Sequence, residues 1–308
     1  MSSRSKTPST LIVGANSLIG KALMLRYNLV GERVIGTTKR REYETDHCIY
    51  LDLSEDVEKW QCPSPVSIAI VCAGVTKIEE CRYKPAESYN INVKGVYHLV
   101  KKLVEQGAFV VFLSTNQVFD GSSPFSLPDD LVSPATEYGR QKAEVERQII
   151  RFEDSVAIVR FTKILSPTFS LFSKWSKMLR EGKAIHPFSN MYMSPLSLSC
   201  AVDVLCLLGK RRLSGILQVS GNSDISYSDA ALFGAKKLKV NPMLVKPIEA
   251  LKPKDYKEHL QKHTTLNIDR LRAALGIEPP DVWWTLEKAF LEPQVLAGFQ
   301  SNLVSISI

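Results

Sequence analysis

Several patterns are missing from this 308-residue sequence, and each absence excludes a class of protein. None of its six cysteines forms a Cys-x-x-Cys pair, so we expect reduced thiols and no zinc site. The longest apolar runs, such as Val66–Val75, have the length of a strand and are too short to span a bilayer. The polar start leads directly into an apolar strand. We therefore expect no signal peptide, no membrane association and a cytoplasmic location.

The excess of positive over negative charge is also small. Lys and Arg total 39 against 32 for Asp and Glu, which gives a formal net charge of +7. A charge this diffuse suits an anionic small molecule such as a nucleotide and does not indicate nucleic acid. With 44% hydrophobic and 23% charged residues, the composition is globular, which excludes a disordered chain, a collagen-like fibre and a coiled-coil rod.

The first half of the chain alternates between short apolar runs rich in Val and Ile and longer amphipathic stretches. Helical periodicity occurs near residues 18–30, 85–106 and 138–152. The runs that we predict to be strands are Thr10–Val13, Arg33–Gly36, Cys48–Leu51, Ile68–Cys72, Phe109–Ser114 and Val156–Phe161. This alternation predicts an α/β fold with a doubly wound parallel sheet of Rossmann type and helices on both faces.

The alternation of strands and helices ends after residue 165, where Ser166-Pro167-Thr168 is a sequence typical of a turn or loop. We predict one domain over residues 1–165 and a smaller C-terminal lobe over residues 166–308. Helices are expected at Leu171–Glu181, Val202–Leu208 (returning to the sheet), Asn267–Leu275 and Val282–Leu291. The uncharged stretch Val295–Ile308 is left without an assignment.

A glycine-containing turn, Gly14–Gly20, follows the first predicted strand and opens a helix. Such a turn brings backbone N–H groups to a pyrophosphate at a helix N-terminus, which makes residues 1–165 a candidate NAD(P)-binding domain. Gly14 would form the turn, and Gly20 would let helix and strand pack closely. Ser17 replaces the middle glycine and would either weaken binding or donate a hydrogen bond. The candidate cofactor residues here are Gly14, Asn16, Ser17, Leu18, Ile19 and Gly20. The alternative is a plain β-turn-α connection.

The end of the second predicted strand carries cations where an NAD-binding fold carries an acid. The run Thr38-Lys39-Arg40-Arg41 suits the 2′-phosphate of NADP, and arginine can bind it in a bidentate manner. We therefore favour NADP over NAD, against the alternative of a solvated basic turn. Asp52 and Leu53, after the third strand, are further candidates, with Asp52 as an acceptor for the adenine amino group.

Two Tyr-x-x-x-Lys pairs occur, Tyr97/Lys101 and Tyr138/Lys142. This spacing puts both side chains on one face of a helix, and a lysine beside a phenol lowers its pKa towards neutrality. The phenol can then exchange a proton with a substrate oxygen. Only Tyr138/Lys142 has hydroxyl residues, Ser114 and Thr115, at a neighbouring strand end, where ligands bind in open α/β sheets. We therefore choose the second pair.

These features occur in the order seen in extended short-chain dehydrogenase/reductases. The run Ser114–Gly121 resembles the S-T-D-Y-V-F-D-G signature of dTDP-4-dehydrorhamnose reductases and their sugar-nucleotide-binding relatives. The segments that resemble the family's cofactor turn, its A-Y-x-V-N-x-x-G helix and its R-x-T strand end are Cys72-Ala73-Gly74, Tyr89–Gly95 and Arg160-Phe161-Thr162. The resemblance covers nearly the whole first half of the chain. It is weak in the second half, which in this family determines the substrate.

The resemblance implies roles for particular residues. Thr115 would hydrogen-bond the reacting oxygen, Tyr138 would donate the proton, and Lys142 would hold the nicotinamide ribose and tune Tyr138. Asn92 would support a water relay to Lys142. It also adds Cys72, Ala73, Gly74 and Ser114 to the cofactor residues, and makes Val75, Asn116, Gln117, Phe119 and Lys163 candidates for the substrate.

The family's Asp-Tyr after the catalytic threonine is Asn116-Gln117 here, which changes the wall facing the substrate. We carry over no metal, because matching acidic ligands are not evident. His259 and His263 have i, i+4 spacing, but an exposed polar helix is favoured over a metal site. A homodimer is the default expectation from the resemblance.

Three functions fit these observations. The first is an NADP-dependent reductase of a nucleotide-linked 4-keto-6-deoxy sugar. The second is an epimerase or dehydratase of nucleotide sugars, which recycles a bound cofactor. The third is a non-catalytic NADP-binding subunit like the regulatory subunit of methionine adenosyltransferase. Fold analogy does not separate the three, although an intact Thr/Tyr/Lys set favours chemistry.

Overall fold

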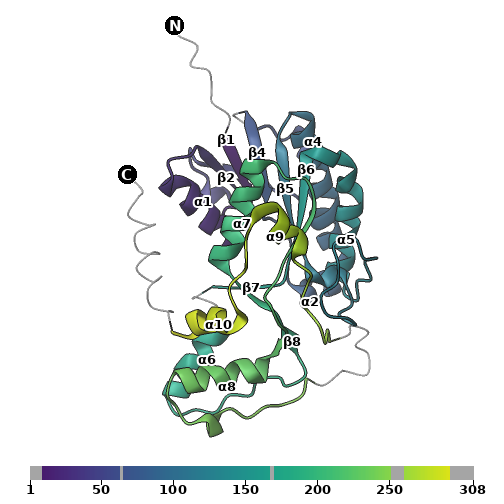
Figure 1. Cartoon of the computed structure of the whole chain (residues 1–308). Helices are drawn as coiled ribbons and strands as arrows, with labels where there is room; N and C mark the ends of the chain where they lie inside the picture. Colours follow the sequence, from purple (N-terminus) through teal and green to yellow (C-terminus); the bar gives the residue numbers. More distant parts are fainter. Residues whose placement is uncertain (1–8, 63–64, 167–169, 251–259, 292–308) are drawn as a thin grey trace.

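Seven parallel strands form one central sheet in the computed structural model, which describes residues 9–62, 65–166, 170–250 and 260–291 (Figure 1). Their order is β10-β6-β5-β4-β1-β2-β3. The strands are β1 (Ser9–Val13), β2 (Val34–Thr38), β3 (Cys48–Tyr50), β4 (Val66–Val71), β5 (Phe109–Thr115), β6 (Val156–Phe161) and β10 (Gly215–Val219). The order reverses between β1 and β4, and ligands bind at such a switch point. The predicted doubly wound α/β fold is confirmed.

Helices cover both faces of the sheet and bury one apolar layer on each. One face carries α1 (Leu18–Leu29), α7 (Leu198–Arg211) and α9 (Asp269–Leu275). The other carries α4 (Val96–Glu105) and α5 (Glu137–Ile149). The helix α7 extends the predicted Val202–Leu208 at both ends and returns to the sheet as expected. The short helices α2 (Ile78–Tyr83) and α3 (Pro85–Tyr89) and a π-helical turn (Asn90–Gly95) lead into α4.

The six strands predicted from the first half are all present. All seven residues of β5 are buried, as are all six of β6. A strand between two neighbours in a parallel sheet is covered on both faces, so it has no polar side to alternate with. The seventh strand, β10, was not predicted. Its Gln218 is fully buried, donating from Nε2 to the carbonyls of Ser126 at 2.8 Å and Asn267 at 3.0 Å.

A smaller lobe lies below the carboxyl ends of the strands in Figure 1. It contains the helices α6 (Ser170–Arg180), α8 (Tyr227–Lys237) and α10 (Val282–Leu291), whose apolar side chains form a core of their own. Two short ladders join β7 (Lys163–Leu165) to β9 (Pro195–Ser197) and β8 (Tyr192–Met193) to β11 (Ile225–Ser226). The division at residue 165 stays a prediction. Beyond that residue, the strand β10 joins the central sheet and the helix α7 packs on one of its faces.

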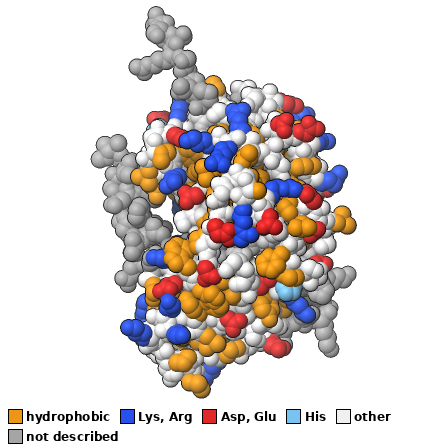
Figure 2. All heavy atoms as spheres, in the orientation of Figure 1, with side chains coloured by type: hydrophobic (Ala, Val, Ile, Leu, Met, Phe, Trp, Pro, Cys, Tyr) orange, Lys and Arg blue, Asp and Glu red, His pale blue; other side chains and the backbone are white. Residues whose placement is uncertain are grey.

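The surface carries both signs of charge. On the face drawn in Figure 2, Lys and Arg side chains are interspersed with Asp and Glu side chains. This distribution agrees with the diffuse net charge of +7. Within the described ranges, no helix combines the length and apolarity needed to cross a membrane.

Candidate functional site

The turn between β1 and α1 has the close packing that its glycines predict. Gly14 has a φ of +85°, and a Cβ there would lie 2.9 Å from the Ala73 backbone nitrogen. A Cβ at Gly20 would lie 2.2 Å from the Gly14 carbonyl oxygen. Ser17 caps α1, because its Oγ accepts a hydrogen bond from Gly20 N at 3.0 Å. The side chain that replaces the middle glycine therefore stabilises the helix start.

A cavity of about 580 Å³, here named the glycine-loop cavity, opens beside this turn. The predicted cofactor residues that line it are Gly14, Asn16, Ser17, Thr38, Lys39, Arg40, Asp52, Leu53, Cys72, Ala73 and Gly74. Val75, predicted to meet the substrate, also lies here. Leu18 is 44% exposed and lines neither cavity, so its contact with the cofactor stays a prediction. Lys21 and Tyr43 line the cavity without having been predicted.

The basic end of this cavity is organised by Thr38. Its Oγ1 accepts hydrogen bonds from Asn16 Nδ2 at 2.8 Å and from Arg40 N at 3.1 Å. The Arg40 guanidinium lies 5.7 Å from the centroid of the Tyr43 ring, at the cavity wall. Arg41 instead stacks 3.7 Å from the Tyr50 ring centroid, outside the cavity lining. Of the two arginines, Arg40 is therefore the one available to an anion.

The end of β3 is fixed by a turn and by close helix packing. Asp52 Oδ1 accepts from Ser54 N at 2.8 Å and from Ser54 Oγ at 2.7 Å. The Leu53 carbonyl oxygen lies 2.0 Å from where a Cβ on Gly95 would be, so only glycine lets the helix approach this closely. Together these contacts hold Asp52 and Leu53 at the cavity wall.

A second cavity of about 650 Å³, here named the tyrosine cavity, shares Cys72 and Ala73 with the first. The helix α5 delivers its central residue. Thr136 caps α5 by accepting from Gly139 N at 3.0 Å, and a Cβ on Gly139 would lie 2.1 Å from the Gln117 carbonyl oxygen. This close approach places Tyr138 beside the end of β5.

The structure brings together most of the residues predicted for chemistry and substrate. The predicted residues that line the tyrosine cavity are Ile19, Cys72, Ala73, Ser114, Thr115, Asn116, Gln117, Tyr138, Lys142 and Lys163. Lys142 follows Tyr138 by one helical turn, as its spacing predicts. The competing Tyr97 lines neither cavity and stacks on Phe152, with ring centroids 6.3 Å apart.

The pKa values of Tyr138 and Lys142 both depart from their ordinary values. Burial raises the pKa of Tyr138 well above its ordinary value, and a hydrogen bond with Thr115 opposes this rise. Burial also lowers the pKa of Lys142 to about 8, against an opposing effect of the Glu146 carboxylate. Lys142 Nζ donates to the Leu113 carbonyl oxygen at 2.7 Å and lies 4.4 Å from the Phe112 ring centroid. The prediction that Lys142 brings the phenol pKa towards neutrality is wrong, because burial dominates and the ammonium is directed at a backbone carbonyl.

A buried ion pair supports this part of the site. Arg160 and Glu146 meet at 2.7 Å, and their side chains are 3% and 5% exposed. The Ser114 hydroxyl also donates to Glu146. Ser114 therefore lines the tyrosine cavity, but its hydroxyl is committed to the carboxylate behind it.

Asn92 holds the turn after β4. Its Oδ1 accepts from Val75 N at 2.7 Å, and its Nδ2 donates to Val75 O and to Gln141 Oε1, both at 2.9 Å. It lies in the π-helical turn, a feature found often at functional sites, but lines neither cavity. Its role in a water relay stays a prediction.

Phe119 lies apart from the other predicted substrate residues, and its contact with the substrate stays a prediction. It is 5% exposed and packs with Val118 and Leu266. The Arg160 guanidinium lies over the Phe119 ring, 5.0 Å from the ring centroid. It therefore belongs to the core and lines neither cavity. The residues that the sequence did not predict for the tyrosine cavity include Thr136, Met191, Tyr192, Met193, Tyr227, Gln261 and Thr264. No motif marks the segments that supply them.

Of the histidine pair, only His263 lies among the described residues, and it is not in a helix. His263 lies in a loop with Nδ1 3.3 Å from Asp224 Oδ2, and residues 260–262 are also outside any helix. His259 lies outside the described residues. Over the described part of the chain, no group of three metal-ligating side chains occurs.

Two kinds of curated protein are similar to this chain. The beta subunit of methionine adenosyltransferase 2 from Rattus norvegicus is 26% identical over 150 residues, which are 49% of this chain and 45% of that protein. The chain thus matches less than half the length of these relatives. A dTDP-4-dehydrorhamnose reductase from Aggregatibacter actinomycetemcomitans is 24% identical over 230 residues, covering 70% of this chain and 77% of the relative.

A solved structure and a family profile agree with the fold. A dTDP-4-dehydrorhamnose reductase from Bacillus anthracis in complex with NADP superposes with a TM-score of 0.78 at 22% identity, covering 92% of this chain and 98% of that one. The profile described as "RmlD substrate binding domain" matches residues 9–294. The chain therefore belongs to the RmlD substrate binding domain family.

Proposed function

We propose that this protein is an NADP-dependent reductase of a nucleotide-activated 4-keto-6-deoxy sugar. The observation that carries the proposal is that two neighbouring cavities share Cys72 and Ala73 in their walls. One contains the glycine turn and the basic end of β2, and the other contains Thr115, Tyr138 and Lys142. Family membership and relatives described as reductases support the same reaction class.

The residues of the glycine-loop cavity fit a dinucleotide. The N-terminus of α1 offers backbone N–H groups and a positive dipole end to a pyrophosphate, and Gly14 lets the backbone approach. Arg40 and Lys39, with no acid at the end of β2, suit the 2′-phosphate of NADP. When bound, the cofactor supplies a hydride to the substrate carbonyl carbon.

The raised pKa of Tyr138 suits the reducing direction. At neutral pH a phenol with a raised pKa is protonated, so it can donate its proton to a carbonyl oxygen that gains negative charge. Thr115, which hydrogen-bonds Tyr138, lines the same cavity and would hold that oxygen. At a pH below its pKa, Lys142 is protonated and places a positive charge next to the reacting groups.

Replacing Arg40 by Ala is expected to raise the KM for NADPH by about ten- to a hundredfold, because a hydrogen bond to a charged group is lost. The KM for NADH should change little, since NADH has no 2′-phosphate. Arg41→Ala is the matched control, because Arg41 stacks on Tyr50 outside the cavity. Steady-state kinetics with both cofactors measures the effect. Equal changes for NADPH and NADH would contradict this role.

The kcat/KM for NADPH is expected to fall as pH rises through about 8, because Lys142 then loses its positive charge. Below that pH the ammonium is present and binding is at its plateau. Glu146→Gln should move the fall to lower pH, since the Glu146 carboxylate raises the pKa of Lys142. A pH profile of initial rates measures both. A fall near the ordinary lysine pKa of about 10.4 would show that burial does not tune this group.

Two observations favour a second function, a non-catalytic regulatory subunit. The methionine adenosyltransferase beta subunits match 49% of this chain, and the family's Asp-Tyr is Asn116-Gln117 here. A panel of nucleotide-linked keto sugars, assayed for NADPH oxidation, separates the functions. Turnover with net NADPH consumption supports the reductase, whereas turnover with a retained, recycled cofactor indicates an epimerase or dehydratase. NADPH binding without turnover, together with a stable complex with another enzyme, indicates the regulatory subunit.

A further inference from the structure

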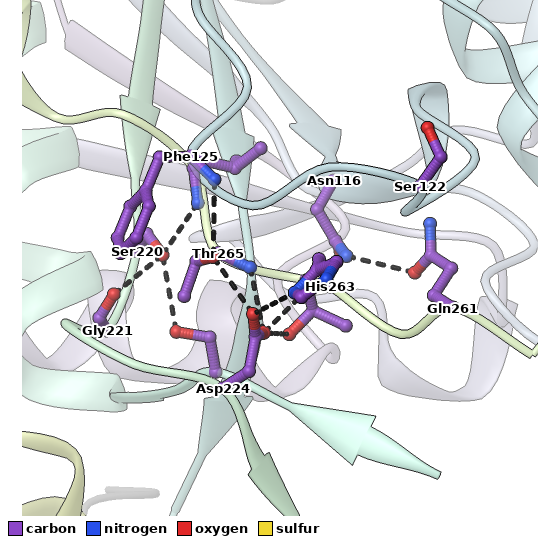
Figure 3. A network of polar contacts seen from close by, with 12 residues as sticks. Asn116, Ser122, Phe125, Ser220, Gly221, Asp224, Gln261, His263 and Thr265 are labelled. Carbon is purple, nitrogen blue, oxygen red and sulfur yellow. Dashed lines mark hydrogen bonds and ion pairs between the residues drawn. The ribbon is translucent and has the colours of Figure 1, made fainter. Parts of the chain in front are cut away.

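A single carboxylate fixes one edge of the tyrosine cavity (Figure 3). Asp224 Oδ1 accepts from Thr264 N at 2.7 Å, Thr264 Oγ1 at 2.8 Å and Thr265 N at 3.0 Å. Its Oδ2 accepts from Thr265 Oγ1 at 3.0 Å and lies 3.3 Å from His263 Nδ1. Three consecutive residues of one extended segment are therefore held by one side chain of the small lobe.

The same segment is packed against the loop after β5. His263 N donates to the Gly121 carbonyl oxygen at 3.1 Å. Gly121 has a φ of +75°, and a Cβ there would lie 2.6 Å from the Cβ of Gln261. Gln261 is thus held against the loop after β5 by this close approach, in a segment whose next residues are held by Asp224.

Gln261 then reaches two side chains that line the tyrosine cavity. Its Oε1 accepts from Asn116 Nδ2 at 3.2 Å and from Gln117 Nε2 at 2.7 Å, and its own Nε2 donates to the Phe119 carbonyl oxygen at 2.7 Å. Figure 3 shows Asn116 and Gln261 facing each other from separate parts of the chain. We name Asn116, Gln117 and Gln261 the carboxamide wall; all three line the same cavity as Tyr138.

This arrangement has a chemical consequence. A carboxamide presents one acceptor oxygen and two N–H donors and carries no charge. Because the Gln261 oxygen takes one N–H from each neighbour, it sets which way both amide groups turn. A neutral wall with donors and acceptors suits sugar hydroxyls, whereas a carboxylate or phosphate would call for cations.

We infer that Gln261 is a substrate-positioning residue, which orients Asn116 and Gln117 so that the carboxamide wall binds neutral hydroxyls of the sugar beside the reacting carbonyl. This inference rests on the proposed reductase function. It assigns the binding of the sugar ring to a contact between the loop after β5 and a segment about 145 residues later.

Gln261→Met keeps the length of the side chain and removes both hydrogen bonds to the wall. With dTDP-4-dehydrorhamnose as the probe, we expect its KM to rise about tenfold while kcat and the KM for NADPH stay near the wild-type values. Gln261→Glu keeps the acceptor for both amides but loses the N–H donated to the Phe119 carbonyl oxygen and adds a negative charge, so it should not restore the affinity. Gln148→Met is the matched control, because Gln148 lies on α5, bonded to Glu144 and outside both cavities.

Gln117→Met provides an independent route to the same conclusion. It should raise the same KM, and the double variant should show less than the sum of the two effects, because the residues act through one contact. An unchanged KM in the single variants of an active enzyme, or additive effects, would overturn the inference alone. A wild-type enzyme that binds NADPH but does not reduce the sugar nucleotide would overturn the proposed function, and the inference with it.

Discussion

Replacing Tyr138 by Phe is expected to lower kcat by about 10²–10⁴-fold, the usual contribution of a positioned proton donor. Phenylalanine keeps the ring that closes the tyrosine cavity and removes only the hydroxyl, which Thr115 contacts. The KM for NADPH and the unfolding temperature should therefore stay near those of the wild type. Stopped-flow measurement of NADPH oxidation with a saturating keto-sugar nucleotide gives the rate directly.

The chain supplies a matched control for this variant. Tyr97 has the same Tyr-x-x-x-Lys spacing, yet it lies on α4 against Phe152 and lines neither cavity. Tyr97→Phe should leave kcat unchanged. A Tyr138→Phe enzyme with wild-type kcat would remove Tyr138 from the mechanism, and equal losses in the two variants would show that the effect is not specific to the site.

Replacing Glu146 by Ala is expected to lower the free energy of unfolding by about 3–5 kcal/mol, because it leaves the Arg160 guanidinium buried without its counter-charge. The pair is almost fully enclosed, and the Ser114 hydroxyl loses its acceptor as well. Urea denaturation followed by circular dichroism measures the loss.

Glu144→Ala is the control for this second prediction. Glu144 pairs with Arg147 at 2.7 Å on the same helix, but the Arg147 side chain is 73% exposed. An exposed pair of this kind contributes about 0–1 kcal/mol, so the loss should be small. Similar losses in the two variants would contradict a special role for the buried pair.

The elements that could be predicted are those whose buried residues form a pattern of neighbouring apolar side chains in the sequence. Continuous apolar runs marked β5 and β6, and periodicity marked α10 at its observed bounds. The strand β10 was missed because Gln218 interrupts its short apolar run, and this buried amide is satisfied by carbonyls 92 and 49 residues away in sequence. Partners at that distance along the chain cannot be recognised from a local pattern.

The site divides in the same way. Thr115 and Tyr138 could be chosen because they occupy a strand end and a helix start, and Lys142 because it follows Tyr138 by four residues on the same helix. Gln261 could not, since its meaning depends on contact with Asn116 and Gln117 across the fold. The lowered pKa of Lys142 could not be predicted either, because it follows from the burial of the side chain in the folded structure.

The most direct test of the central claim follows the hydride itself. The protein is mixed with dTDP-4-dehydrorhamnose and NADPH that carries deuterium at the transferable position, and the sugar product is examined by NMR. The account predicts that deuterium appears on the sugar carbon that carried the carbonyl, with NADPH consumed in equal amount. A product without the label, or no product while both ligands bind, would contradict it.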